Sequence, residues 1–298
     1  MDAAAMNEQT QQCPLFSEEI RRRQAEQTGG GPQTEFPTGN TPFVEYARMD
    51  ELLQLRRPRT KALTEPAFIV MSQVKELLFD LLRTEFGTAR GQLAKDAVED
   101  ALWTLRRASR IQDVLLASWD VLAALTPLEF AEFRDVLGNA SGFQSVSYRR
   151  LEFLLGNKNP AMAIPHGKSP AYHDIDAQLR EPSLYDEALG LLSRAGFDIP
   201  DRCLRRDFAV PYQPDDAVES AWRAVYADPG GHRRLYLLAE GLMDTADQFA
   251  RWRYTHLVTV QRMLGAKPGS GGTHGVAWLK GIAEHRFFPE LWSVRSTI

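Results

Sequence analysis

Apolar residues recur at intervals of three and four along most of this chain, and that spacing restricts its fold more than any other feature of the sequence. One long stretch of this kind runs from 94 to 125, and its apolar face carries Ala97, Ala101, Leu105, Ala108, Ile111, Leu115 and Trp119. The same spacing predicts helices over 66–85 and 232–264. No run alternates apolar with polar residues, and no Asn-Gly or Asp-Gly turn occurs, so β-hairpins are not expected. We therefore predict an all-α helical bundle.

Turn and cap residues divide the rest of the chain into shorter helices. Thr126-Pro127-Leu128-Glu129 combines a capping box with proline at the first helical position, so one helix ends before it and another begins there. A glycine at position 156 is expected to end a helix. The further short helices are predicted over 145–155, 183–195 and 215–227, and within 273–298.

Residues 1–38 differ in composition from the rest, since they are polar and rich in Gly, Pro, Thr and Gln. Such a segment buries too little apolar surface to offset the entropy lost on ordering. We predict a flexible N-terminal arm over 1–38, with one short helix near 16–27, and a single helical domain over 39–298. The arm is expected to become ordered against a partner subunit.

Charge and cysteine content exclude several classes of protein. Lys and Arg number 35 against 39 Asp and Glu, a net charge of -4 that gives no basic surface for nucleic acid. Only Cys13 and Cys203 are present, so no disulfide framework is expected and a reducing compartment is indicated. No apolar run approaches the roughly 18 residues of a membrane span, and the N-terminus lacks a signal-peptide pattern. We expect a cytoplasmic protein without membrane contact.

The sequence has no HExxH, CxxC, P-loop or GxSxG motif, and no GxGxxG before a helix, so one histidine becomes the main candidate for chemistry. On the predicted helix 232–264, His256 shares an apolar face with Phe249, Trp252, Val260 and Met263. A histidine in such a face is usually a core residue with one satisfied hydrogen bond. The alternative is an axial ligand of haem iron in a bundle core, with an Asp or Glu upstream orienting its other nitrogen.

Phe130 and Arg134 lie four apart on the helix that begins at Pro127, so they share one of its faces. Arg134 either extends to water and pairs with Glu132 or Asp135, or forms a bidentate clamp on a substrate carboxylate. Two glycine-rich loops, 138–142 and 265–275, follow candidate residues. The second is either a flexible connection or a set of backbone amides that bind an anion.

Seven segments of the chain resemble the tryptophan 2,3-dioxygenase family. They are FIVMSQ at 68–73, TPLEFAEFRDVLG at 126–138, SGFQS at 141–145, YRRLEFLLGNKNP at 148–160, RWRYTH at 251–256, GSGGT at 269–273 and FFPELW at 287–292. The resemblance runs from about Thr41 to the C-terminus and is most specific between Phe133 and Pro160. It implies a homotetrameric, all-α oxygenase with heme b, which uses O2 to open the indole C2–C3 bond of L-tryptophan.

The resemblance also implies roles for individual residues. His256 matches the iron ligand, and Arg134 and Ser270 match residues that hold the amino-acid head group. Phe68 and Phe130 match residues that line the indole slot. The remaining positions carried over are Trp119, Ser141, Gly142 and Tyr148 in the haem pocket, and Phe43 and Tyr46 on an arm that reaches a neighbouring subunit's site.

Four positions depart from the family's pattern. Ser72 stands where the family has a distal histidine and would face the bound oxygen, Phe130 and Phe43 replace tyrosines, and Ser270 replaces a threonine. The pocket is therefore expected to be roomier and less polar, which would admit a substituted tryptophan such as a β-methyl derivative. Indole keeps its N–H during dioxygenation, and the related indoleamine dioxygenases also carry a distal serine, so ring cleavage is not excluded.

The predicted function is that of a haem-dependent oxygenase acting on the indole C2–C3 bond of tryptophan or an analogue. The sequence leaves three alternatives open. The first is monooxygenation to a 2-oxindole, as in natural-product biosynthesis, in place of ring cleavage to N-formylkynurenine. The second is a non-catalytic sensor of haem or indole, and the third is a helical scaffold in which His256 is merely buried.

Overall fold

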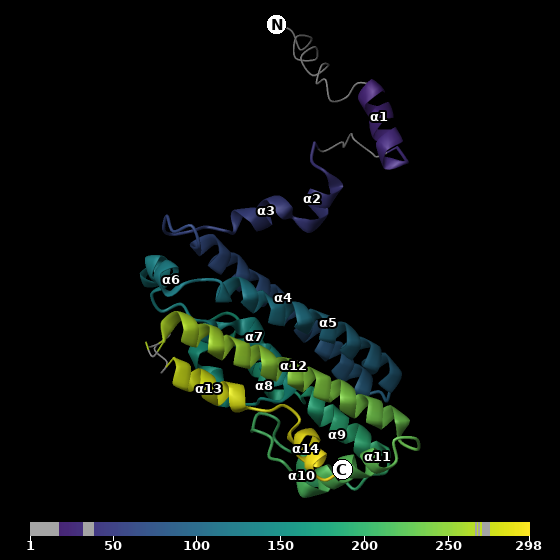
Figure 1. The fold of residues 1–298 in the computed structure, drawn as a ribbon. Coiled ribbons are helices and arrows are strands. Elements are labelled where there is room, and N and C mark those ends of the chain that lie inside the picture. The colour runs from purple at the N-terminus through teal and green to yellow at the C-terminus, as the bar shows by residue number, and fades with distance from the viewer. Residues whose placement is uncertain (1–17, 32–38, 266, 268, 270–274) are drawn as a thin grey trace. The chain divides into compact units, whose positions relative to one another are not determined.

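A computed structural model describes residues 18–31, 39–265, 267, 269 and 275–298. Within these residues all regular structure is helical, which confirms the predicted all-α class (Figure 1). The chain divides into two compact units, 1–57 and 58–298. The α-helices are α1 (Glu18–Thr28), α2 (Pro42–Ala47), α3 (Met49–Gln54), α4 (Glu65–Leu93), α5 (Val98–Ala123), α6 (Pro127–Arg134), α7 (Val146–Leu155), α8 (Tyr172–Arg180), α9 (Leu184–Arg194), α10 (Asp201–Leu204), α11 (Asp216–Ala227), α12 (Arg233–Leu264), α13 (Val276–Glu284) and α14 (Pro289–Ser293). The short 3-10 turns are η2 (Asp135–Leu137), η3 (Gly142–Gln144), η4 (Pro160–Met162), η5 (Ile164–His166) and η6 (Val294–Ser296).

Three long helices form the body of the second unit. Helices α4, α5 and α12 lie side by side in Figure 1, and α5 packs along both of the others. Helices α7 and α9 pack against α4, and α13 packs against α12. The core between them includes the fully buried side chains of Phe86, Leu115 and Phe249. Removal of these apolar surfaces from water is the main favourable contribution to folding.

The junction between α4 and α5 differs from the predicted helix ranges. Helix α4 continues past the predicted end at 85 to Leu93, because Phe86, Ala89 and Leu93 extend its buried face. Helix α5 begins at Val98 and not at 94, since Asp96 adopts a positive φ of 58° that is incompatible with a continuing right-handed helix. The tight connection sets the two helices antiparallel.

The predicted cap residues end and begin helices as expected. Thr126 Oγ1 accepts from the backbone N–H of Glu129, whose carboxylate accepts from the backbone N–H of Thr126 at 2.8 Å, and this capping box begins α6. Gly156, at φ 106°, ends α7, and Gly265 ends α12. The predicted helices 183–195 and 215–227 correspond to α9 and α11. Helices α2, α3, α8 and α10 are not among those that the periodicity predicts.

The first unit contains α1, α2 and α3. Helix α1 lies where the short helix near 16–27 is predicted. None of the residues in these three helices is buried within the chain. The first compact unit ends at Arg57. The predicted boundary between a flexible arm and a helical domain, after residue 38, stays a prediction.

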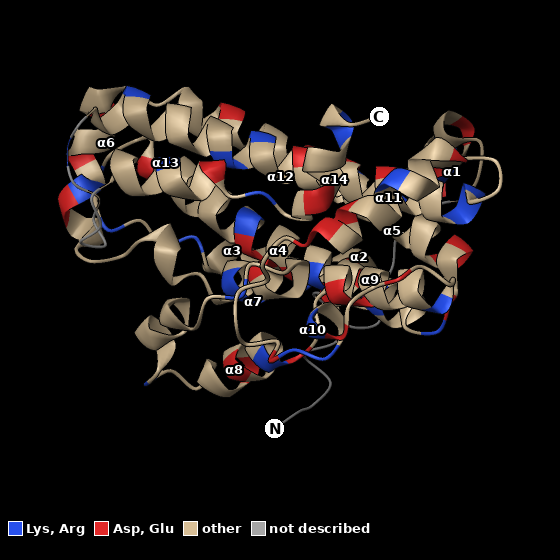
Figure 2. Cartoon of the chain, turned by 90° about the horizontal axis from the view of Figure 1, so that it is seen from below, with Lys and Arg blue, Asp and Glu red and all other residues tan. Residues whose placement is uncertain are grey.

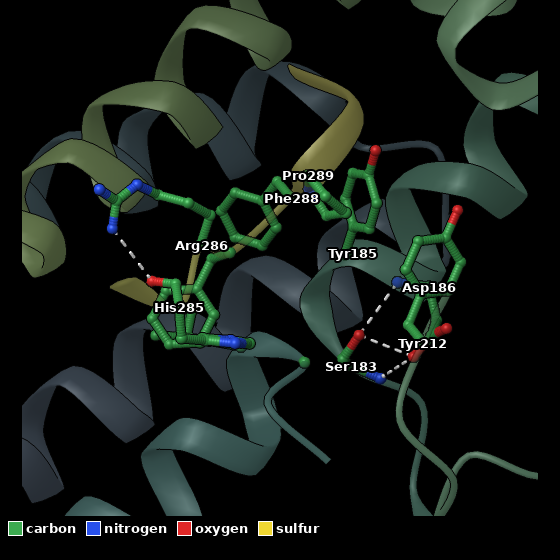
Figure 3. A pocket seen from close by; sticks show the side chains of 11 residues that line it. Ser183, Tyr185, Asp186, Tyr212, His285, Arg286, Phe288 and Pro289 are labelled. Atoms are coloured by element: carbon green, nitrogen blue, oxygen red, sulfur yellow. Dashed lines mark hydrogen bonds between the residues drawn. The ribbon is translucent and has the colours of Figure 1, made fainter. Parts of the chain in front are cut away.

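The C-terminal segment FFPELW is held in place by Glu290, whose side chain is buried. Tyr185 and Tyr212 donate their hydroxyls to this carboxylate at 2.8 and 2.6 Å, and the backbone N–H of Asp215 donates at 2.9 Å. A cavity of about 50 Å³ lies beside the two tyrosines and His285 (Figure 3). The segment therefore ties the end of the chain to α9 and to the segment that precedes α11.

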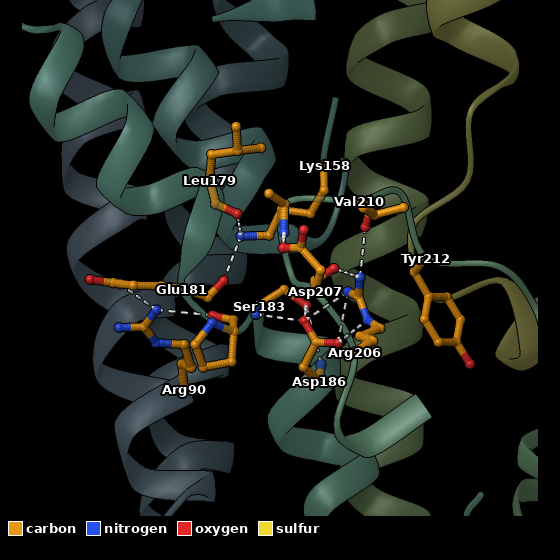
Figure 4. Close-up of polar contacts among 12 residues, drawn as sticks. Arg90, Lys158, Leu179, Glu181, Ser183, Asp186, Arg206, Asp207, Val210 and Tyr212 are labelled. Atoms are coloured by element: carbon orange, nitrogen blue, oxygen red, sulfur yellow. Dashed lines mark hydrogen bonds and ion pairs between the residues drawn. The ribbon is translucent and has the colours of Figure 1, made fainter. Parts of the chain in front are cut away.

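Lys158, in the segment YRRLEFLLGNKNP, has a structural role. Its buried ammonium donates to the carbonyl oxygens of Gln178, Leu179 and Glu181 at 2.7, 3.0 and 2.7 Å (Figure 4). The last carbonyls of a helix have no partner within the helix, and a positive charge is favourable beside them. Lys158 therefore caps α8 and fixes it close to the end of α7.

Basic and acidic side chains are interspersed along the same helices of the bundle (Figure 2). Several form ion pairs one helical turn apart, such as Arg180 with Asp176 and Arg251 with Asp247. Exposed pairs of this kind each contribute little to stability. No single helix in the described part of the chain is long and apolar enough to span a membrane, although the bent pair Val98–Ala123 and Pro127–Leu137 meets the requirement by length and composition.

Candidate functional site

His256, on α12, stacks on Trp119, on α5. The two ring centroids are 4.4 Å apart and the ring planes differ by 16°. Trp252, one turn earlier on α12, contacts the same imidazole with a centroid distance of 5.8 Å. Stacking covers a face of the imidazole and leaves its two nitrogens at the ring edge, where a metal ion would bind.

The surroundings of His256 keep its imidazole neutral. Burial, and then the nearby ammonium of Lys75, lowers the pKa of His256 to about 3. Neutral imidazole has a lone pair on one nitrogen, which is the form that ligates iron. Within the described residues no carboxylate contributes to this shift and no hydrogen bond engages the ring, so the Asp or Glu expected to orient it is not found there.

An aromatic wall, formed by Phe79, Trp119, Tyr148 and Trp252, continues from His256. Trp252 lies 5.7 Å from Trp119, 5.4 Å from Tyr148 and 5.5 Å from Phe79, measured between ring centroids. Phe79 and Tyr148 are 5.0 Å apart. The wall joins α4, α5, α7 and α12, and it brings together three residues that the sequence assigns to the haem pocket: Trp119, Tyr148 and His256.

A buried ion triad supports the wall from behind. Glu152 pairs with Arg253 at 2.8 Å and with Arg149, and all three side chains are only 2% exposed. Arg253 also donates to the Tyr148 hydroxyl at 3.2 Å. Burial alone would raise the pKa of Glu152, but Arg253 and Arg149 outweigh it and lower the pKa, so this carboxylate stays ionised. The triad fixes the position of Tyr148, whose own pKa is raised, chiefly by burial.

Phe68 and Phe130, the two residues predicted to line an indole slot, contact each other. Their centroids are 5.8 Å apart, and Phe133 lies 5.4 Å from Phe68 and 5.3 Å from Phe130. Arg134 follows as the last residue of α6 and is partly buried. Ser72, one turn after Phe68 on α4, is exposed, and its hydroxyl donates to the carbonyl oxygen of Phe68 at 2.8 Å.

Ser141 and Gly142 begin a short turn after α6. Ser141 Oγ accepts from the backbone N–H of Phe143, and the Gln144 side chain accepts from the backbone N–H of Ser141, at 3.4 and 3.3 Å. This capping box gives the loop one defined conformation. Phe143 then packs edge-on against Trp278 of α13 at 5.3 Å, which ties the loop to the helix after α12.

Three predicted site residues lie outside the described part of the second unit. Ser270 lies outside the described residues. Phe43 and Tyr46 lie on α2 in the first unit, where they are 67% and 93% exposed. Their assignment to a neighbouring subunit's site remains a prediction.

Sequence reasoning missed Lys75, Glu152 and Arg253. Lys75 follows Ser72 by one turn on α4, and that spacing was the available signal.

Among the described residues no group of three or more His, Cys, Asp or Glu side chains could hold a metal ion, so a metal would meet His256 as a single protein ligand. The cavity of Figure 3 and a surface hollow of about 460 Å³ near Arg194 and His232 contain none of the predicted site residues.

Comparison with known proteins identifies the family. A sequence model of the tryptophan 2,3-dioxygenase family matches residues 27–180 and 174–298. A tryptophan 2,3-dioxygenase of Burkholderia pseudomallei (strain 1106a) is 43% identical over 257 residues, which make up 86% of this chain and 84% of that protein. The chain belongs to the tryptophan 2,3-dioxygenase family. A tryptophan 2,3-dioxygenase of Burkholderia mallei (strain SAVP1) shows the same 43% identity over the same length. The resemblance stated from the sequence is therefore confirmed, and the chain is an oxidoreductase.

The residues around His256 fit the haem that this family uses. The imidazole is neutral, and no described residue occupies the nitrogen lone pair that an axial ligand needs. The indole N–H groups of Trp119 and Trp252 are buried and have no acceptor among the described residues. Buried donors without an acceptor are rare in native proteins, and they commonly mark where a bound group supplies one.

Proposed function

We propose that this protein is a haem-dependent oxygenase that inserts both atoms of O2 at the indole C2–C3 bond of tryptophan, or of a substituted tryptophan such as a β-methyl derivative. The product is an N-formylkynurenine. The observation that carries the proposal is the neutral imidazole of His256, stacked on Trp119 beside buried donors, in a chain of the tryptophan 2,3-dioxygenase family.

His256 is the residue that would hold the iron, and Trp119 and Tyr148 belong to the wall against which the porphyrin would pack. When bound, the haem supplies the centre that activates O2. The contribution of the chain is position and environment. The Glu152 triad fixes Tyr148, and the stack on Trp119 fixes the plane of the imidazole, so that neither group needs to reorganise during turnover.

The substrate would be held at the other end of the site. Arg134 carries a planar guanidinium suited to bidentate binding of a carboxylate, and Ser270 is assigned to the same head group. Phe68, Phe130 and Phe133 form an apolar surface for the indole ring. Because the Ser72 hydroxyl already donates to Phe68 O, its lone pairs remain available to accept the indole N–H, and no base removes that proton.

The assembly and location are part of the same proposal. A homotetramer, in which Phe43 and Tyr46 of the arm reach a neighbouring subunit's site, would bury aromatic side chains that are exposed within one chain. Two cysteines in the full sequence suit a reducing cytoplasm. Sedimentation of the full chain tests the tetramer. Turnover by a chain lacking residues 1–47 tests the arm, since the arm exchange predicts that the truncated chain loses turnover.

Turnover under 18O2 tests the reaction. Haem-loaded, reduced protein is supplied with tryptophan and β-methyltryptophan, and the products are analysed by mass spectrometry. Two labelled oxygen atoms in a ring-opened product are expected, because dioxygenation consumes O2 without a further reductant. One labelled atom in a 2-oxindole would overturn ring cleavage. No turnover of either substrate, with haem bound, would favour a sensor.

Arg134→Leu tests the carboxylate clamp. We expect the dissociation constant for tryptophan to rise about 10- to 100-fold, the usual loss for a charged hydrogen bond, while binding of plain indole changes little. Both constants can be measured from haem difference spectra. Arg110→Leu, which removes an exposed arginine from α5, is the matched control. Equal weakening of tryptophan and indole would contradict the clamp.

A further inference from the structure

Helix α4 places three site residues at successive levels. Phe68 contacts the phenylalanine cluster next to Arg134, Ser72 follows one turn later, and Lys75 follows after a further turn. Lys75 is only 8% exposed, and its Nζ lies 3.3 Å from the centroid of the Trp119 ring. It is therefore a buried cation on the same indole that stacks on His256.

This ammonium has no counter-ion in the described part of the chain. Burial lowers the pKa of Lys75 to about 7, and no described carboxylate opposes that shift, so an anion bound beside the side chain would favour its ammonium form. None of the hydrogen bonds of the described residues uses Lys75 as a donor. The face of Trp119 stabilises a cation, but an ammonium carries three N–H donors and the ring satisfies at most one. The N–H of Trp119 and that of Trp252 also have no acceptor among the described residues.

The Lys75 side chain and the two indole N–H groups are buried donors without an acceptor among the described residues. Such a group of donors is complementary to an anion, and a carboxylate is the anion that the proposed reaction brings. It brings carboxylates from two sources, the amino-acid substrate and the side chains of the porphyrin. The substrate carboxylate is assigned to Arg134, beside Phe68. Lys75 lies seven residues beyond Phe68 on α4, which places it roughly 10 Å further along the helix axis. There it lies against Trp119, the ring on which His256 stacks.

Resting on the proposed function, we propose that the buried ammonium of Lys75, together with the indole N–H of Trp119, binds a carboxylate side chain of the porphyrin and so anchors the haem against α4 and α5. The anchor is separate from the iron ligand on α12. It supplies an anionic acceptor to a buried amine and an indole N–H that have none among the described residues.

The test compares haem with its dimethyl ester, in which both carboxylates are blocked, in the full-length protein and in Lys75→Met. Methionine is an unbranched side chain one atom shorter than lysine, and it removes the charge. We expect the substitution Lys75→Met to weaken haem binding about tenfold or more. The variant and the unmodified protein should bind the ester equally well. Lys75→Arg should restore most of the affinity for haem. Lys280→Met, an exposed lysine on α13, is the control.

The outcomes separate this inference from the proposed function. If esterification weakens binding equally in Lys75→Met and in the unmodified chain, Lys75 does not contact a porphyrin carboxylate. If Lys75→Met weakens tryptophan binding and leaves haem affinity unchanged, the lysine serves the substrate carboxylate and the inference is wrong. A Lys75→Met protein with the helical content of the unmodified chain excludes misfolding as the cause. If the unmodified chain binds no haem at all, the proposed function itself fails.

Discussion

His256→Ala is expected to leave a folded protein that no longer retains haem and has no measurable oxygenase activity. The imidazole is the group that we expect to ligate iron, since it is neutral, stacked on Trp119 and free of hydrogen bonds to described residues. Changes to groups that only orient a ligand cost about 10- to 100-fold in metal affinity, so loss of the ligand itself should cost more. Titration of the apoprotein with haem, followed by its Soret absorption, measures the loss.

Added imidazole provides a sharper version of this experiment. In His256→Gly the space left by the side chain is open to a free imidazole, which should partly restore haem binding and its spectrum. His173→Ala, which removes an exposed histidine on α8, is the control and should behave as the unmodified protein does. Normal haem affinity and an unchanged spectrum in His256→Ala would show that another residue holds the iron.

The helical spacing was sufficient to place His256 on an apolar face, because residues three and four apart on one helix share a side. It could not reveal that Trp119 stacks on this ring, since that contact joins α5 to α12 and depends on how the two helices pack. Lys75 illustrates the same limit. On its own helix it is a polar residue among apolar ones, and it becomes a buried cation only when Trp119 of α5 covers it.

The segments that carry the family resemblance were informative about identity but not about the role of each residue. Lys158 and Glu290 both belong to these segments, and both are used to hold the fold together. Their partners lie about 20 and 78 residues away along the chain, so no local pattern could distinguish them from residues of the site. The same holds for Glu152, whose pairing with Arg253 spans two helices.

Glu152→Gln is expected to destabilise the protein by about 3–5 kcal/mol, the usual cost of removing one partner from a buried ion pair. The reason is that Arg253 and Arg149 would remain buried as positive charges without the carboxylate between them. Urea unfolding of the unmodified protein and the variant, at one protein concentration, measures the difference. Glu181→Gln is the matched control: Glu181 pairs with Arg90 at 2.7 Å but is 50% exposed, so its loss should cost less than about 1 kcal/mol.

The pH dependence of stability gives this prediction a second, independent readout. Because the pKa of Glu152 is lower in the folded protein than in the unfolded chain, the stabilisation that it provides is fully present above its unfolded pKa, near 4.5. It is lost as the pH falls through the lowered folded value. Glu152→Gln should therefore be less stable at neutral pH and lose less stability on acidification than Glu181→Gln does. Equal stability of the two variants at neutral pH would mean that the triad is held by the packing around it and not by the carboxylate.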